Sequence, residues 1–172
     1  MEGDERRQFI LKLLAGSESP LSGTEIAGKC GVSRQIIVQD IALLRATNKN
    51  ILSTYRGYLL YQPEKDTENF KRTFAVSHTD EQIQDELYTF VDCGGKVLDV
   101  TVMHEIYGAI TVDLILNNRV DVDDFTTRLF TTPAKPLKEL TGGNHMHTVE
   151  ASSPEVLDRI EEQLKKKGYL IR

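Results

Sequence analysis

The sequence is poor in cysteine and has no long apolar run. Only two cysteines occur among its 172 residues, Cys30 and Cys93, and they lie far apart and outside any Cys-x-x-Cys pattern. This argues against a disulfide framework and a cysteine-based zinc site, and it indicates a reducing cytoplasm. No apolar run approaches the roughly 20 residues that span a bilayer. The N-terminus, MEGDERRQFILKLLAG, is too acidic and too interrupted for a signal peptide. We therefore expect a cytoplasmic protein without a membrane segment.

The chain as a whole also lacks an excess of basic residues, since its formal net charge is −5. The charge is unevenly distributed, however. Residues 1–62 contain eight Lys or Arg and six Asp or Glu, whereas residues 63–172 contain thirteen and twenty. A mildly basic part joined to an acidic remainder is typical of a DNA-binding module attached to a second domain. The polar segment YQPEKDTENF has no apolar periodicity, so we place a linker at 63–69, between domains 1–62 and 70–172.

The first domain carries the pattern of a helix-turn-helix motif. Apolar spacing predicts a first amphipathic helix over 9–16. A second helix is predicted over 23–30, ended by Gly31, which can adopt the left-handed conformation. A third helix over 34–46 follows Ser33 as its N-cap. A short helix, a turn with glycine and a longer helix form the helix-turn-helix arrangement.

The third predicted helix has a polar face that suits DNA. Its apolar stripe consists of Ile37, Ile41 and Leu44. The opposite face carries Arg34, Gln35 and Gln39, which are the residue types that pair with guanine and adenine edges in the major groove. The following stretch, ILSTYRGYLL, predicts two short strands that form a wing with Arg56 near its tip. The candidate DNA-contacting residues are Thr24, Ser33, Arg34, Gln35, Gln39 and Arg56. A three-helix module that mediates only protein contacts is the alternative.

The second domain alternates strands and helices. Strands are predicted at 74–78, 96–104, 109–116, 145–151 and 169–171, and helices at 79–95, 120–132 and 153–168. Thr79 is the expected N-cap of the first of these helices, with Gln82 at the capping-box position. This order predicts an α+β sandwich, in which helices pack on one face of a mainly antiparallel sheet.

Two of the four histidines form a His-x-His pair in the stretch TGGNHMHTVEA. Because side chains alternate along a strand, His145 and His147 would share one face. In the helix after His78, Glu86 falls about 60° from the apolar position Ile83, at roughly 100° per residue. A carboxylate on the packing side needs a partner, since an unpaired buried charge is costly. The candidate metal site is therefore His78, Glu86, His145 and His147, whose donors suit Zn²⁺, Ni²⁺, Mn²⁺ or Fe²⁺.

Other interpretations of these residues stay open at this point. Glu86 could form a salt bridge at the rim of the domain, with the histidines on the surface and no metal. Cupin enzymes follow a strand His-x-His with a Glu after three or four intervening residues, but only two residues separate Glu150 from His147, and Glu150 would face opposite His147. A metal hydrolase would need a further acid or base, so neither class of enzyme fits well.

The whole chain resembles a family of bacterial regulators. The stretch SPLSGTEIAGKCGVSRQIIVQDIALLR resembles winged helices of the biotin-repressor type, although no ligase domain follows it. The stretches RQIIVQDIALLR, STYRGYLL, VSHTDEQIQDEL, VMHEIYG, GGNHMHTVEA and LKKKGYLI are similar to the niacin-responsive repressors of NAD-synthesis and niacin-uptake genes, whose C-terminal part is a three-histidine (3H) domain. The resemblance implies a homodimer that binds operator DNA and nicotinic acid. It also implies one divalent metal per subunit, Ni²⁺ or Zn²⁺ before Mn²⁺ or Fe²⁺, held by His78, Glu86, His145 and His147.

The same resemblance implies an effector site near the metal. The candidate effector-binding residues are His104, Tyr107, Gly142 and Gly143. The two glycines would permit close approach of the backbone to a ligand. His104 could line the pocket, bind the metal as a fifth ligand, or be a structural histidine. A purely metal-responsive regulator and a metal-dependent enzyme acting on a pyridine or NAD precursor are the alternatives to a niacin sensor.

Overall fold

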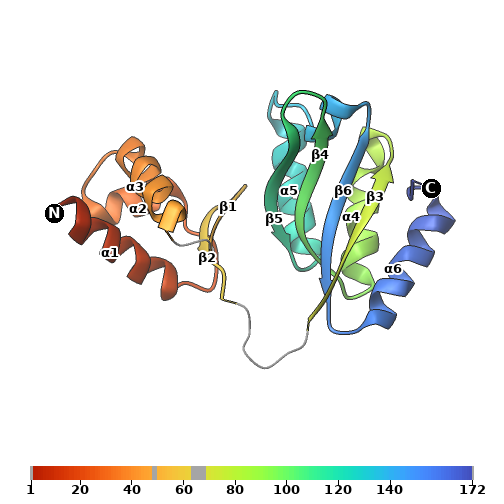
Figure 1. The fold of residues 1–172 in the computed structure, drawn as a ribbon, viewed down its shortest axis with the longest axis horizontal. Helices are drawn as coiled ribbons and strands as arrows, with labels where there is room; N and C mark the ends of the chain where they lie inside the picture. Colours follow the sequence, from red (N-terminus) through yellow and green to blue (C-terminus); the bar gives the residue numbers. More distant parts are fainter. Residues whose placement is uncertain (1, 48–49, 63–68, 172) are drawn as a thin grey trace. The chain divides into compact units, whose positions relative to one another are not determined.

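The structure, a computed structural model, describes residues 2–47, 50–62 and 69–171. The chain divides into two compact units, Met1–Lys65 and Asp66–Arg172, and each unit is described by itself (Figure 1). Residues 63–68 of the predicted linker lie outside the described residues. No helix in the described part of the chain has both the length and the apolar character needed to cross a bilayer.

The N-terminal unit contains three helices and a two-stranded wing. Its elements are α1 (Gly3–Ala15), α2 (Gly23–Cys30), α3 (Arg34–Thr47), β1 (Ile51–Thr54) and β2 (Gly57–Leu60). The three helices share one apolar cluster, to which α1 contributes Ile10 and Leu14 and α3 its predicted stripe. The helix-turn-helix prediction is therefore confirmed. Helix α1 begins earlier than predicted because a capping box between Glu2 and Glu5, rather than apolar residues, forms its first turn.

Local capping explains where the two helices of the motif begin and end. Ser22 accepts a hydrogen bond from the backbone N–H of Glu25 (3.1 Å), and Ser33 accepts one from that of Ile36 (3.4 Å). Between them Gly31 adopts φ +67°, a conformation that ends α2 and turns the chain into α3. The start of α3, where the candidate base-contacting residues lie, is thus fixed by the turn that precedes it.

The wing is attached to the helices by one further backbone pairing. Leu21 and Tyr58 exchange two backbone hydrogen bonds of 2.8 Å each, so Leu21 adds a single bridge beside β2. Gly57 lies where the backbone of Leu21 comes close to the wing. It has φ +141°, and a Cβ atom there would collide with the carbonyl of Leu21. A glycine is required at this position for steric reasons as well as for its backbone conformation.

The C-terminal unit is an antiparallel sheet with helices packed on one face. Its strands are β3 (Phe70–Ser77), β4 (Lys96–His104), β5 (Gly108–Leu116) and β6 (Asn144–Ala151), in the order β3-β6-β4-β5. Its helices are α4 (Ile83–Asp92), α5 (Arg119–Thr131) and α6 (Pro154–Lys167), with short 3-10 segments η1 (Asp80–Gln82) and η2 (Leu137–Thr141). Figure 1 shows α4 and α5 behind the sheet and α6 alongside β3. The predicted α+β class is confirmed.

Two features of this unit differ from the prediction. The strand expected at 169–171 is reduced to one bridge, between Leu170 and Val76, flanked by backbone bonds from Ser77 to Tyr169 and from Ile171 to Ala75 (2.9 Å each). The segment directly follows Gly168, whose left-handed backbone (φ +75°) ends α6, so the pairing with β3 begins only at Tyr169. The predicted helix at 79–95 is split into η1 and α4, although the capping box of Thr79 and Gln82 is present as expected.

Candidate functional site

Three histidines and one glutamate meet between the sheet and α4. His147 Nε2 lies 3.4 Å from Glu86 Oε1, and His145 Nε2 lies 3.9 Å from the same oxygen. His78 Nε2 lies 3.4 Å from Glu86 Oε2. All four side chains are nearly inaccessible, with at most 4% of each exposed. The structure thus brings together the whole set that the sequence singled out.

Two strands and one helix position this cluster. His145 lies opposite Val76 and His147 opposite Phe74 in the antiparallel pairing of β6 with β3, so both imidazoles face the helices. His78 directly follows β3, and Glu86 lies in the first turn of α4 on its buried side. The ring of His147 makes an edge contact with Phe90 of α4 (centroids 5.5 Å apart). Packing of α4 against the sheet therefore sets the distance between carboxylate and imidazoles.

Each imidazole of the cluster is oriented by a backbone carbonyl. The Nδ1 atoms of the three histidines lie 2.8, 2.8 and 2.7 Å from the carbonyl oxygens of Thr79, Gly143 and Asp99 respectively. A carbonyl oxygen only accepts, so each Nδ1 carries the proton and each neutral ring leaves a lone pair on Nε2. This arrangement is typical of histidine ligands, in which a hydrogen bond to the second nitrogen fixes the tautomer.

The polar atoms at the centre of the cluster lack hydrogen-bonding partners. Among the described residues, His78 Nε2 and Glu86 Oε1 are buried without a hydrogen bond. Such orphaned atoms are rare and costly inside proteins. Candidate ligand atoms of His78, Glu86 and His145 all lie within 4.8 Å of one another. A divalent metal with a preference for nitrogen and oxygen would satisfy them, so the donor set fits such an ion.

Burial and mutual charge shift the protonation of these groups in different directions. Burial, assisted by repulsion from His147, lowers the pKa of His145 to about 4. Burial also works against the charged form of His78, but the proximity of Glu86 outweighs it and raises the pKa of His78. Burial of Glu86 favours its neutral form, yet attraction to His147 and the other imidazoles lowers its pKa. His145 is consequently neutral at physiological pH, which is the form that binds metals.

A small cavity adjoins the cluster on the helix side of the sheet. This inner cavity, about 70 Å³, is walled mainly by apolar side chains of α4, α5, β4, β5 and η2. Its polar lining consists of His78, Glu86, His145, His147 and Lys138. Lys138 is only 7% exposed and was not anticipated as a functional residue. The sequence gives only a weak indication that Lys138 is buried, because a lysine between two leucines in KPLKEL also fits a surface turn.

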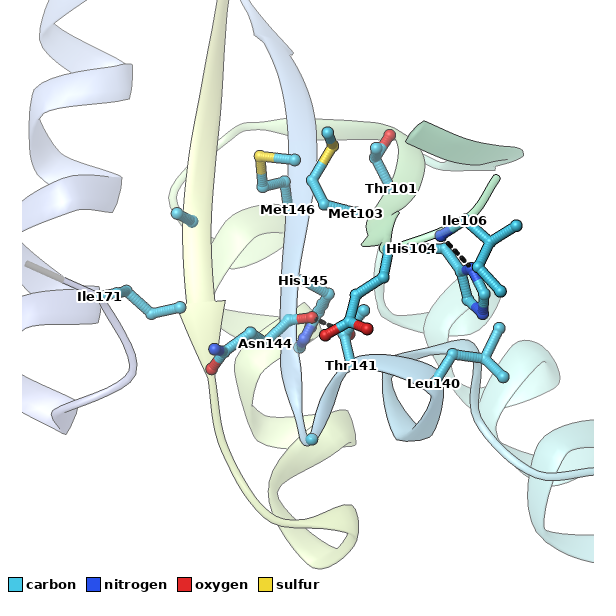
Figure 2. Close-up of a pocket in the computed structure, with 13 residues that line it drawn as sticks. Thr101, Met103, His104, Ile106, Leu140, Thr141, Asn144, His145, Met146 and Ile171 are labelled. Carbon is cyan, nitrogen blue, oxygen red and sulfur yellow. Dashed lines mark hydrogen bonds between the residues drawn. The ribbon is translucent and has the colours of Figure 1, made fainter. Parts of the chain in front are cut away.

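The four candidate effector residues are not among those that line the inner cavity. His104 and Gly142 instead line an outer hollow of about 680 Å³, next to Thr101 and Met146 (Figure 2). The Nδ1 atom of His104 accepts from the backbone N–H groups of Ile106 and Tyr107 (3.2 and 3.3 Å), so this ring stabilises the turn between β4 and β5.

Tyr107 and Gly143 lie outside both cavities. Tyr107 is 77% exposed and lies against the His104 ring (centroids 4.9 Å apart). Gly143 has φ +99°, and its carbonyl oxygen orients the ring of His145 in the candidate metal site. The effector-binding roles of these four residues therefore stay predictions.

Five of the six candidate DNA-contacting residues are exposed and lie at the start of α2 or α3. Thr24 lies in the first turn of α2, and Ser33, Arg34, Gln35 and Gln39 lie at the beginning of α3, all exposed. Arg56 lies in the turn between β1 and β2, half-buried, with its guanidinium 5.4 Å from the ring centre of Tyr55. A recognition helix presents its N-terminal residues to base edges in such motifs, which is the placement found here.

The recognition helix is held by an ion pair that the sequence did not reveal. Asp40 of α3 is 3% exposed and accepts hydrogen bonds from Arg6 Nε (2.6 Å) and from an Nη atom of Arg7 (3.1 Å), both on α1. Two arginines in the first helix therefore point inward, towards α3.

Exposed polar residues at a helix-turn-helix, joined to a second domain with a buried histidine–carboxylate cluster, indicate a DNA-binding regulator with a separate second domain. Comparison with known proteins agrees. Residues 71–172 match the 3H domain family, and residues 6–59 match a helix-turn-helix domain. The chain belongs to the family of transcription repressors that carry a 3H domain, and it is a DNA-binding repressor rather than an enzyme.

Two relatives extend over nearly the whole chain. The chain is 41% identical over 167 residues to a protein of Thermotoga maritima named "Probable transcription repressor NiaR", covering 97% of this chain and 94% of that protein. It is 37% identical over 171 residues to the "Transcription repressor NadR" of Bacillus subtilis, covering 99% and 95%. The resemblance to repressors of this kind, inferred from the sequence, is confirmed.

Proposed function

We propose that this repressor controls genes of NAD synthesis or niacin transport in response to nicotinic acid, and that its 3H domain needs a divalent metal to do so. The observation that carries the proposal is the buried cluster of His78, Glu86, His145 and His147, in which His78 Nε2 and Glu86 Oε1 have no hydrogen bond to any described residue. Buried polar atoms of this kind need a ligand, and the donor set suits Ni²⁺ or Zn²⁺, with Mn²⁺ and Fe²⁺ as further candidates.

The four protein ligands would leave coordination positions open on an ion that accepts five or six. When bound, the ion would supply Lewis acidity to a ligand nitrogen or carboxylate in the inner cavity, and nicotinic acid has both groups. The protein supplies the rest: the carbonyls of Thr79, Gly143 and Asp99 hold the rings in place, and apolar side chains line the adjoining inner cavity.

The cluster is placed where a ligand can influence the fold. His78 follows β3 and Glu86 lies on α4, whereas His145 and His147 belong to β6. A ligand that binds both parts more tightly in one arrangement shifts the protein towards that arrangement. We propose that the protein acts as a homodimer, and that this shift changes the spacing of two winged helices. Half-sites read by such dimers lie about 34–36 Å apart, so a small rotation changes operator affinity.

Operator binding by the purified protein tests this function. Fluorescence anisotropy of a labelled operator would be measured with and without nicotinic acid, before and after chelation, at one fixed salt concentration. Tighter binding that requires both acid and metal is the expected result. The double variant His145→Ala/His147→Ala should lose the response. Binding that follows the metal but ignores the acid would contradict niacin sensing and indicate a purely metal-responsive repressor.

A further inference from the structure

Lys138 is a buried cation beside the candidate metal cluster. It lies on η2, and its side chain is 8% exposed. Its Nζ atom donates to the carbonyl oxygen of His78 (3.2 Å) and forms an ion pair with Asp80 Oδ1 (2.6 Å). A lysine is almost never buried without a partner of opposite charge or a function, because removing its charge from water is costly. The question is whether Asp80 alone accounts for its position.

The hydrogen-bonding capacity of Lys138 is incompletely used. An ammonium group has three N–H donors. One goes to the carbonyl of His78 and one to Asp80, and the described residues offer no acceptor for the third. Asp80 is itself 44% exposed, so water competes for its carboxylate. Lys138 lines the inner cavity together with the cluster, so its side chain adjoins the space that a ligand would enter.

The walls of the inner cavity suit a flat apolar ring. Leu87, Leu114 and Phe125 come from a helix, a strand and another helix, and together with other apolar residues they surround the polar cluster. The residues that line this cavity include one basic side chain besides Glu86 and the histidines, and it is Lys138. Pockets for small molecules combine such apolar walls with a few polar groups that fix the orientation of the ligand.

We propose that Lys138 is the residue that recognises the carboxylate of the effector and makes the sensor prefer a small aromatic acid to the corresponding amide. This inference rests on the proposed function, since it assigns a residue to the effector of the same domain. The ring occupies the inner cavity, and its carboxylate accepts the free N–H of Lys138. A neutral amide gains no charge-assisted hydrogen bond there, and such bonds are about twice as strong as neutral ones.

The size of the cavity adds a consequence for η2. The inner cavity measures about 70 Å³, whereas a cavity of roughly 150 Å³ accommodates a benzene ring. Binding therefore widens the cavity. The wall formed by Leu137 and Lys138 belongs to a five-residue 3-10 segment, whereas the opposite walls are long helices and strands. Outward movement of η2 exchanges the pairing of Lys138 with Asp80 for pairing with the ligand, so Asp80 is a competitor of the ligand.

Calorimetric titration of the full-length, metal-loaded protein with nicotinic acid and with nicotinamide tests the inference. Lys138→Met keeps the length of the side chain and removes its charge. It should weaken binding of nicotinic acid about 10- to 100-fold, change nicotinamide binding less than about twofold, and bring the acid-to-amide preference close to one. Metal content and thermal unfolding, measured on the same samples, verify that the variant is folded and retains its ion.

Asp80→Asn separates recognition from a structural role. If Lys138 only anchors η2 through Asp80, both variants should weaken nicotinic acid binding alike. If Lys138 recognises the carboxylate, Asp80→Asn should bind the acid at least as tightly as the unchanged protein, because a competitor is removed. Unchanged acid binding in Lys138→Met, or equal losses in both variants, would overturn the inference while the sensor function stands. No binding of nicotinic acid to the unchanged, metal-loaded protein would overturn both.

Discussion

The Nε2 atom of His147 lies 3.4 Å from Oε1 of Glu86, although two strands and a helix separate β6 from α4 along the chain. The two atoms meet because α4 packs across the sheet with Glu86 on its buried side. The Nδ1 atom of His147 lies 2.7 Å from the carbonyl oxygen of Asp99, so in the neutral ring Nε2 directs a lone pair towards the carboxylate of Glu86. The contact is the basis of the first two predictions.

Metal should stabilise the C-terminal domain. A ligand that binds only the folded state adds about 2.7 kcal/mol at a concentration 100 times its Kd. We expect thermal unfolding, followed by circular dichroism, to occur several degrees higher with Ni²⁺ or Zn²⁺ than after chelation. The variant His145→Ala/His147→Ala should show no such difference. Equal melting temperatures of the loaded and chelated protein would count against a metal site.

Replacing Glu86 should weaken metal binding. Glu86→Gln changes a carboxylate that is 1% exposed and faces three imidazoles. The metal affinity of the variant should fall about 10- to 100-fold, because an anionic ligand is replaced by a neutral one. Glu81→Gln, at an exposed position one turn earlier, is the matched control and should leave the metal affinity unchanged. Calorimetric titration with Ni²⁺ or Zn²⁺ measures both variants, and an unchanged affinity in Glu86→Gln would contradict a ligand role for Glu86.

Residues at the start of α3 should determine sequence specificity. We expect Gln35→Ala or Arg34→Ala to weaken operator binding by about 1–3 kcal/mol each, as for loss of a contact with a base edge. Arg45→Ala, near the other end of the same helix, removes the same charge as Arg34→Ala and should weaken operator and random DNA equally. Competition assays at one salt concentration measure the affinities for operator and for random DNA. If Arg34→Ala behaved like Arg45→Ala, its role would be limited to the phosphate backbone.

The ion pair between α1 and α3 should hold the recognition helix in place. Asp40→Asn leaves Arg6 and Arg7 without their buried carboxylate, so the N-terminal domain should unfold several degrees lower and bind operator more weakly. Asp4 also pairs with Arg7, but its side chain is 95% exposed, and Asp4→Asn should have no measurable effect. Equal melting curves for the two variants would contradict this role of Asp40.

The wing should tolerate no side chain at Gly57. Gly57→Ala places a Cβ atom against the carbonyl of Leu21 in a backbone conformation unsuited to alanine, so it should disrupt the pairing of Leu21 with Tyr58 and weaken DNA binding. Gly28 lies within α2, and a Cβ atom there meets nothing within 4 Å. Gly28→Ala should therefore be neutral or stabilising. Chemical denaturation and operator titration of the two variants would check this, and equal behaviour would refute the steric argument.

Local physical rules made much of the architecture predictable. The capping box at Thr79, the left-handed Gly31 and the alternation along β4 depend on neighbouring residues, so the sequence alone indicates them. The cluster of His145, His147 and Glu86 could also be predicted from the sequence, because strand alternation and helical periodicity indicate which side chains share a face. Lys138 was not, since its burial depends on the course of η2, a segment without periodicity.

The amino-acid sequence by itself determined the order of the elements and the helix-turn-helix with its wing, because these follow from contacts between residues near one another in the chain. Strand alternation and helical periodicity also singled out the four clustered side chains as candidates. Only the tertiary structure decided which groups those side chains face. It placed the carbonyl oxygens behind the three imidazoles, Asp40 between two arginines and Lys138 beside an apolar cavity. These relationships join segments far apart in the sequence, and the packing of α4, η2 and α1 against their neighbours brings them into contact.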